Sequence, residues 1–349
     1  MNSRERVLSI LTTKDADRMA CFSGMGSVLT ASLEEYGYKF PTVHGDPVKM
    51  ANTAAYTCKA TGMESAIVPY DMCVDAEALG CVMNAYEDVN QLLYPTIKEK
   101  IIHSQDDMVN FTIPDKIWEK GRYPVVLEAL RLLKNDIGDE FAVCGWLLGP
   151  FTMAGQMMDL NDLFKLVFKK PDLVNKLLST LTDLIITMAA KYREAGADYI
   201  CIREMGATTD VLSPRNFKQC IDPHLQRIFA SIPKPHILHI CGSTNIVMKN
   251  MAASGADAIS VEIKNDLKKS REDIGYDPLL FGHIDAYSVL VLGTPEVVEQ
   301  ATIASMEGTV DSVWPSCDIW PEAPVANVKA MVDTVKKYGV EKWYRKNNR

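Results

Sequence analysis

The sequence lacks several features that would each assign it to a particular class of protein. No segment approaches the roughly 20 uninterrupted apolar residues of a membrane-spanning helix. The charged opening, MNSRERVLSILTTKDADR, lacks the apolar centre of a signal peptide. Basic residues are not in excess, because 37 Lys and Arg stand against 45 Asp and Glu, a formal net charge of −8. We therefore expect a cytoplasmic protein that binds neither membranes nor nucleic acids.

The cysteines lack the pattern of a disulfide framework. Nine are present, an odd number, scattered along the whole chain. In a reducing cytoplasm most cysteines stay free and behave as small buried hydrophobic residues. A cysteine with a chemical role must therefore be recognised by its neighbours.

The chain also lacks low-complexity segments and linkers rich in Pro, Gly and Ser. Its 349 residues, 47% hydrophobic and 23% charged, have the composition of an ordinary globular protein and can bury a large core. We predict a single domain over residues 1–349, because α/β barrels commonly reach this length in one unit.

What the sequence does contain is an alternation of short apolar runs with longer helical patterns. The runs are almost continuously apolar, as expected for strands buried on both faces of a parallel sheet. They are Met19–Phe22, Ser65–Pro69, Phe141–Trp146, Asp198–Arg203, His236–Cys241, Ala258–Glu262, Leu279–Ile284 and Ser312–Pro315. Among the helical patterns, Pro214–Ser231 and Pro295–Met306 follow Ser213 and Thr294, hydroxyl residues suited to capping a helix that begins with proline.

About eight strands without a GxGxxG turn favour a closed (β/α)8 barrel, the TIM-barrel architecture, over a doubly wound sheet. Residues 23–140 fit the repeat poorly. There we expect extra N-terminal helical elements, which would form a cap.

The chemistry of such a barrel lies where its strands end, at one rim. His239 and Cys241 are two residues apart in a predicted strand, so their side chains project to the same side, and Gly242 permits the turn that follows. Cys317 ends a later strand. One imidazole and two thiolates are a ligand set that zinc favours. The alternative is a buried histidine with its hydrogen bonds satisfied beside unreactive cysteines, and the spacing alone leaves both open.

Other strand ends offer further candidates. Glu262 could complete a zinc site, or it could pair with a basic residue at the rim. His283 and Asp285 could transfer protons. The alternative is that His283 is a loop histidine and Asp285 a helix cap. Six further residues near the rim could contact a planar or apolar substrate, and the two charged ones could instead form ion pairs at the rim. They are Trp146, Arg203, Glu204, Met205, Trp314 and Trp320.

These segments carry a resemblance to a known family. At Leu238–Gly242, at Ser260-Val261-Glu262 and at Cys317 the chain resembles the uroporphyrinogen decarboxylase superfamily, in particular its zinc-containing, corrinoid-linked methyltransferases. Members of that branch are the methylcobamide:coenzyme M methyltransferases and the corrinoid-dependent O-demethylase methyltransferases. Residues 4–8, with Asp17 and Arg18, and residues 121–129 are also similar to segments of that superfamily.

The resemblance implies a TIM barrel whose His239, Cys241 and Cys317 bind zinc, with Glu262 as a tentative fourth ligand. It also implies a partner protein that carries the corrinoid, and a small molecule that gives or accepts the methyl group. Zinc would activate the heteroatom that bears or receives the methyl group.

Two departures from the family refine the predicted function. Residues 22–29 contain no arginine, although the decarboxylases carry an arginine-rich motif there for the carboxylates of their substrate. Residues 318–321 are larger than in the coenzyme M enzymes.

We therefore predict a methyltransferase acting between a methoxylated aromatic or other methyl donor and the corrinoid. A methylcobamide:thiol methyltransferase is the alternative, and a uroporphyrinogen-type decarboxylase the third possibility. The sequence leaves the substrate and the oligomeric state open.

Overall fold

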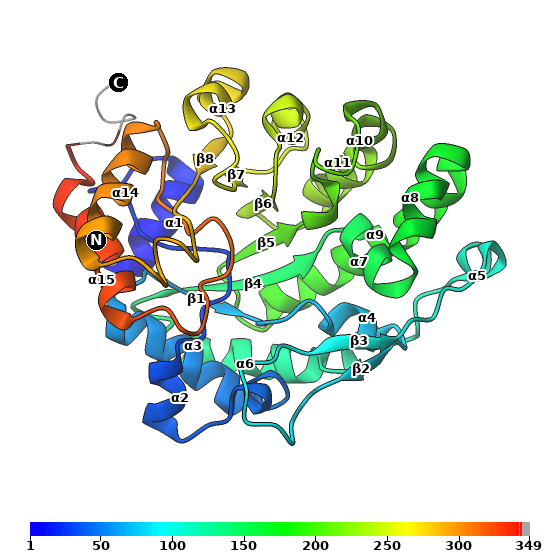
Figure 1. The fold of residues 1–349 in the computed structure, drawn as a ribbon, viewed down its shortest axis with the longest axis horizontal. Helices are drawn as coiled ribbons and strands as arrows, with labels where there is room; N and C mark the ends of the chain where they lie inside the picture. The colour runs from blue at the N-terminus through cyan, green and yellow to red at the C-terminus, as the bar shows by residue number, and fades with distance from the viewer. Residues whose placement is uncertain (342, 344–349) are drawn as a thin grey trace.

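The centre of the computed structural model, which describes residues 1–341 and 343, is a sheet of six parallel strands (Figure 1). Neighbouring strands follow the order β1-β4-β5-β6-β7-β8, so each strand pairs with the next one of the sheet along the chain. They are β1 (Ser65–Val68), β4 (Ala142–Leu148), β5 (Tyr199–Arg203), β6 (His236–Ile240), β7 (Ala258–Val261) and β8 (Leu279–Phe281). All their residues are buried, as their continuous apolar sequences predict.

Two shorter segments close this sheet into a ring. Ser312 forms parallel bridges to both Phe281 of β8 and Ala20, and the backbone N–H of Glu64, just before β1, donates to the carbonyl of Cys21 at 2.9 Å. The ring therefore contains all eight predicted apolar runs in chain order. The predicted (β/α)8 barrel is confirmed.

The helices form the outer layer of the barrel (Figure 1). They are α1 (Ser3–Thr13), α2 (Thr30–Tyr36), α3 (Pro47–Thr61), α4 (Val74–Ala78), α5 (Gln105–Asn110), α6 (Tyr123–Asp136), α7 (Pro150–Met157), α8 (Leu160–Lys169), α9 (Pro171–Glu194), α10 (Pro214–Cys220), α11 (Asp222–Ser231), α12 (Met248–Ala252), α13 (Leu267–Ile274), α14 (Pro295–Glu307) and α15 (Val325–Tyr338). Short 3-10 helices are η1 (Phe40–His44), η2 (Ile117–Glu119), η3 (Met205–Ala207) and η4 (Asn245–Val247).

The helix starts agree only in part with the sequence. Ser213 caps α10 as predicted, accepting a hydrogen bond from the N–H of Asn216 at 3.2 Å. The predicted helix Pro214–Ser231 is divided into α10 and α11, because Pro223 has no N–H to continue the helical ladder. Thr294 precedes α14 without capping it, and its hydroxyl donates to Glu296 instead, at 2.7 Å.

Residues 23–140 hold most of the elements that do not belong to the barrel repeat. The helices α2, α4 and α5 are extra, and they are accompanied by an antiparallel pair of strands, β2 (Val82–Asn84) and β3 (Thr96–Glu99). This β2–β3 hairpin was not expected from the sequence, since its strands are short and mostly exposed and show no apolar alternation. Residues 342 and 344–349 of the predicted single domain lie outside the described part.

Helix α9 is the one helix within the described residues that is long and apolar enough to cross a membrane. Half of its most apolar window, 50%, is buried inside the protein, and the helix packs against α7, α11 and β4. Core helices of barrels have the same composition, so this helix is accounted for by its packing in the fold.

The amino-terminal end of the barrel is held by a buried carboxylate. Glu64 is fully buried and forms an ion pair with Arg6 of α1, a second one with Arg18 at 3.1 Å, and accepts the N–H of Cys21 at 2.7 Å. A single carboxylate thus joins α1, the first barrel segment and the start of β1.

We expect Glu64→Gln to lower the free energy of unfolding by about 3 kcal/mol or more, because removing one partner leaves buried charge uncompensated. Urea unfolding followed by circular dichroism measures the change, with Glu272→Gln on the exposed surface of α13 as the control. A loss below about 0.5 kcal/mol, the usual range for surface substitutions, would contradict this role.

Candidate active site at the carboxyl rim of the barrel

His239 and Cys241 face each other at the end of β6. His239 is fully buried, its Nδ1 lies 3.0 Å from the hydroxyl of Ser260 on β7, and its Nε2 lies 2.9 Å from Sγ of Cys241. The alternation of an extended strand places both side chains on one side. Gly242 then turns the chain with φ +78°, and a Cβ at this position would collide with Thr208.

The environment of His239 keeps its imidazole neutral. Burial, with a smaller contribution from the positive charge of Arg203, lowers the pKa of His239 to about 3. A neutral imidazole is the form that binds metal ions. The Ser260 hydroxyl holds the ring through the nitrogen that does not face Cys241, as partners of metal-binding histidines do.

Cys317 is brought to Cys241 from the last segment of the ring. The two thiols interact directly: the pKa of Cys241 is raised, chiefly by its hydrogen bond with Cys317, and that same bond lowers the pKa of Cys317. These are the two partly exposed cysteines, and the other seven are buried. The structure therefore brings His239, Cys241 and Cys317 together at the carboxyl rim.

The donor chemistry of these three side chains fits zinc. As the side chains are placed, no group of three or more His, Cys, Asp or Glu residues in the described part of the chain has the geometry of a metal site. A tetrahedral zinc would hold a nitrogen and a sulfur ligand about 3.5 Å apart, whereas His239 and Cys241 lie 2.9 Å apart in a hydrogen bond. The two atoms would have to move about 0.6 Å further apart to have the spacing of two ligands of one zinc ion.

Glu262 lies at the end of β7 beside this group. Its carboxylate accepts a hydrogen bond from the backbone N–H of Gly242, and its negative charge is one of the smaller causes that raise the pKa of Cys241. In this position Glu262 holds the turn that carries Cys241. Its role as a fourth ligand stays a prediction.

His283 and Asp285 follow β8 and make contacts within loops. Nε2 of His283 lies 3.0 Å from the carbonyl oxygen of Asn265. Asp285 accepts the N–H groups of Tyr287 and Ser288, both at 2.9 Å. The contact of His283 is that of a loop histidine, whereas Asp285 holds a turn, since no helix begins between β8 and α14. Their roles in proton transfer stay predictions.

Arg203 and Trp146 lie behind the site as its support. Arg203 is 1% exposed, and its guanidinium carbon lies 3.8 Å from the ring centre of Trp146, whose indole N–H donates to the carbonyl of Pro69 at 2.6 Å. Nη1 of Arg203 donates to Asp318 at 2.8 Å and Nε donates to the carbonyl of Gly24 at 3.0 Å. These contacts fix the residue that follows Cys317.

Glu204 and Trp314, two of the predicted substrate-binding residues, are fully buried. Glu204 accepts the N–H groups of Phe151 and Thr152 at 2.9 and 2.7 Å, and so caps the start of α7 from β5; burial raises its pKa to about 7. Trp314 lies in the barrel core, stacked on Phe281 with ring centres 4.9 Å apart. Met205 is half-buried at the start of η3.

A cavity of about 480 Å³ opens beside Cys317. Of the predicted residues, Cys317 and Trp320 line it. The remaining lining residues are Tyr70, Asp71, Met72, Cys73, Leu92, Tyr94, Pro95, Thr96, Ile97, Gln156, Asp318, Pro321 and Glu322. Many come from the segment around β3, whose placement over the rim no sequence pattern predicted. Asp71, an acidic residue two positions after the predicted apolar run Ser65–Pro69, carried a signal in the sequence that could have indicated this part of the cavity.

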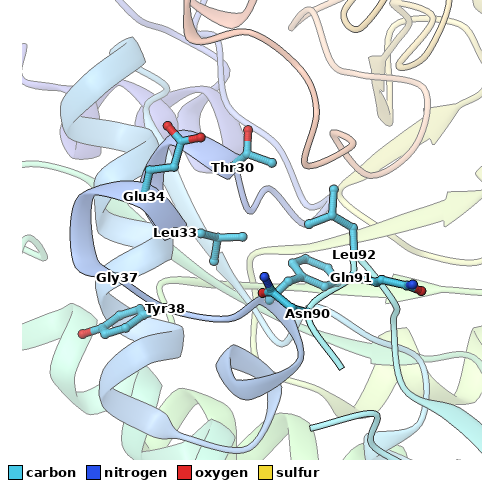
Figure 2. Close-up of a pocket in the computed structure, with 9 residues that line it drawn as sticks. Thr30, Leu33, Glu34, Gly37, Tyr38, Asn90, Gln91 and Leu92 are labelled. Atoms are coloured by element: carbon cyan, nitrogen blue, oxygen red, sulfur yellow. The ribbon is translucent and has the colours of Figure 1, made fainter. Parts of the chain in front are cut away.

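A second, smaller hollow of about 250 Å³ lies nearby, between α2 and residues 90–92 (Figure 2). It shares Leu92 with the cavity beside Cys317. Thr30, Glu34, Tyr38 and Gln91 are among its lining, which includes no histidine or cysteine. The chemistry of the candidate site is therefore at the larger cavity.

The comparisons with known proteins point to one family. Residues 2–338 match the family described as uroporphyrinogen decarboxylase (URO-D). The chain is 30% identical over 336 residues to the methylcobamide:CoM methyltransferase MtaA of Methanosarcina barkeri, covering 96% of this chain and 98% of that one. It is 28% identical over 340 residues to the methylcobamide:CoM methyltransferase MtbA of Methanosarcina acetivorans, with 96% and 98% covered. A solved methyltransferase from Methanosarcina mazei superposes with a TM-score of 0.91 at 29% identity, covering 97% of this chain and 99% of that one.

The cap that Glu204 provides can be tested directly. We expect Glu204→Gln to cost about 1–3 kcal/mol in the free energy of unfolding, since an amide NH₂ would replace one of the two oxygens that accept the first N–H groups of α7. Thermal or urea unfolding measures the loss, and Glu35→Gln on exposed α2 is the control. Equal stability of the two variants would contradict the capping role.

Proposed function

Because the chain belongs to the uroporphyrinogen decarboxylase family, we propose that it is a methyltransferase acting between a small molecule and the corrinoid of a partner protein. In this proposal His239, Cys241 and Cys317 hold a zinc ion. The observation that carries it is the meeting of one neutral imidazole and two thiols, one of which, that of Cys317, lines a 480 Å³ cavity. Relatives that share nearly the whole length of the chain are named as corrinoid-dependent methyltransferases.

Zinc bound here would supply a Lewis acid that lowers the pKa of a thiol or of a departing hydroxyl group. The chain's own residues prepare the site. Ser260 orients His239 so that Nε2 points to Cys241, and both thiols must release their protons to become ligands. The ion pair between Arg203 and Asp318 fixes the segment that presents Cys317 to the cavity.

The cavity lining supports methyl transfer over the decarboxylation of a porphyrinogen. A porphyrinogen carries several carboxylates, and these need cationic partners. The lining residues of the described cavity include three carboxylic acids, Asp71, Asp318 and Glu322, and no lysine, arginine or histidine. Such a lining would repel a polycarboxylate.

For the small molecule, we place a thiol acceptor first. The relatives' names give CoM, a thiol, as the acceptor of their methyl group, and a zinc site with two thiolate ligands suits the binding of a third sulfur. A methoxylated aromatic donor is the second candidate. It is favoured by the aromatic side chains of Tyr94 and Trp320, which would accommodate a planar ring in the cavity.

The rim also offers a surface to a corrinoid protein. Exposed apolar side chains stand on the loops after six of the eight ring segments, around the site. They are Met72, Val211, Ile246, Ile263, Tyr287 and Trp320, each between 38% and 65% exposed. Exposed apolar groups around a cavity are typical of surfaces that bind another protein, and a corrinoid must reach the cavity from this side.

We expect the purified protein to contain about one zinc ion per chain, and the double variant Cys241→Ser with Cys317→Ser to contain less than about a tenth of that, because it retains only one strong ligand. Mass spectrometry of the metal content after dialysis gives the number. Cys58→Ala, which changes a buried cysteine of α3, is the matched control and should retain the metal. Zinc retained by the double variant would contradict the assignment of the ligands.

A methyl-transfer assay tests the reaction itself. We expect the zinc-containing protein to transfer the methyl group of methylcobalamin to small thiols, followed by the change in corrinoid absorbance and by mass spectrometry of the thioether. The double cysteine variant should lower the rate by a factor of about 100 or more, since the acceptor loses its activation. If only methoxylated aromatics methylate the reduced corrinoid and no thiol accepts the group, the second candidate replaces the first. Activity with neither class would reject the proposed function.

A further inference from the structure

The charges that line the cavity beside Cys317 are all of one sign. Asp71, Asp318 and Glu322 line it, and no lysine, arginine or histidine of the described chain does so. The neighbouring hollow in Figure 2 repeats this pattern, since Glu34 is its one charged lining residue. An anionic group of a substrate would therefore find no cationic partner there.

Two arginines come close to the cavity, and both are already engaged. Arg122 forms a two-pronged ion pair with Asp71, at 2.7 and 2.9 Å, and another with Glu77 at 2.6 Å. Arg203 binds Asp318 from behind and lies over Trp146. Both guanidinium groups are buried behind the carboxylates that face the cavity. They neutralise these carboxylates, and neither is available to a ligand.

Glu322 differs from the other two acids. It is exposed at the mouth of the cavity and has no hydrogen bond or ion pair to any residue of the described chain. Its charge acts on the cavity wall: burial raises the pKa of Tyr94, and Asp318 and Glu322 are the next causes of that increase. Glu322 thus contributes an uncompensated negative charge beside the aromatic wall.

That wall is suited to a positive charge. Tyr70, Tyr94 and Trp320 all line the cavity together with Glu322. Aromatic faces attract ammonium groups, and a carboxylate at the edge of such a wall adds to the attraction. Neither feature would stabilise a sulfonate or a carboxylate.

We propose that the small molecule methylated at this site carries a positively charged ammonium group, placed between the aromatic wall and Glu322 while its sulfur is directed to Cys241 and Cys317. This rests on the proposed function, and it identifies the substrate class as a small aminothiol. The relatives' CoM, 2-mercaptoethanesulfonate, carries the opposite charge at the corresponding end.

The reaction balances without a further reactant. The thiol loses its proton to solvent on binding, and its sulfur electron pair forms the new bond to the methyl carbon. The bond between that carbon and the corrinoid breaks, and both of its electrons remain with the corrinoid. The ammonium group takes no part in bond making and serves only to bind.

Three thiols with the same two-carbon chain differ in the charge at the end opposite the sulfur: 2-aminoethanethiol, the neutral 2-mercaptoethanol and 2-mercaptoethanesulfonate. Calorimetric titration gives the Kd of each, and methyl transfer from methylcobalamin gives kcat/KM. We expect the Kd of the aminothiol to be about tenfold or more lower than that of the sulfonate, and its kcat/KM to be about tenfold or more higher, with the neutral thiol between them in both quantities. The reason is that reversing a charge near one partly screened carboxylate is worth on the order of 1.4 kcal/mol.

Substitutions of Glu322 separate the effect of the protein from the thiols' own reactivity. Glu322→Gln should reduce the ratio of the aminothiol's kcat/KM to that of the sulfonate by about threefold. Glu322→Lys should reverse the preference, so that the sulfonate has the higher kcat/KM. Glu272→Gln and Glu272→Lys change the net charge equally on exposed α13, outside the cavity, and should leave the ratio unchanged.

The outcomes distinguish this inference from the function on which it rests. If the sulfonate thiol binds and reacts as well as the aminothiol, or if Glu322→Lys leaves the order unchanged, the charge preference is rejected while methyl transfer stands. If no thiol accepts a methyl group, the proposed acceptor is rejected, and the order of the Kd values still decides the charge preference. Aminothiol binding that is no tighter than sulfonate binding overturns the inference.

Discussion

One buried guanidinium group holds the candidate site together. Arg203, at the end of β5, lies on Trp146 of β4 and binds the carbonyl of Gly24 and the carboxylate of Asp318. Asp318 in turn accepts the backbone N–H of Gly26. Because a buried charge without its partner costs several kcal/mol, the segment after the last ring strand must return to this position. Cys317 is the residue before Asp318, so the same constraint places its thiol beside Cys241.

The barrel supplies the other half of the site through strand geometry alone. Parallel strands present all their carboxyl ends at one rim, and the pairing of β6 with β7 puts His239 opposite Ser260, within hydrogen-bond distance. The positive φ of Gly242 then turns the chain directly after Cys241. The proposed ligand set would thus join a rigid strand end to a loop that is held by an ion pair, which would give it both precision and an open side.

The sequence was sufficient for the ring segments because their signals are local, whereas it left the metal-binding role of His239, Cys241 and Cys317 as one of two interpretations. Eight apolar runs identify eight ring segments, and the spacing of His239 and Cys241 is read within one strand. An ion pair at the rim was one of the interpretations for Arg203, but its partner Asp318 could not be identified. The helix cap provided by Glu204 could not be recognised either, since Asp318 and Thr152 are distant in the chain and no pattern links them. The β2–β3 hairpin has short exposed strands, so neither its existence nor its position beside Cys317 could be predicted.

The candidate site has two parts, barrel-segment ends fixed by the core and loops that line the cavity. This explains how one barrel can serve different substrates. The groups that would activate a sulfur atom lie at the ends of the barrel segments and are fixed by the core. They would therefore act in the same way whatever charged group the rest of the substrate has. The charge of the cavity wall comes from loop residues. Asp71 and Asp318 are neutralised by buried arginines that the fold itself requires, whereas Glu322 is free of such contacts. Under the proposed function, a substitution at Glu322 would therefore change which charge the cavity accepts without disturbing the barrel or the proposed ligand set, so that specificity would change through the loops while the chemistry remains.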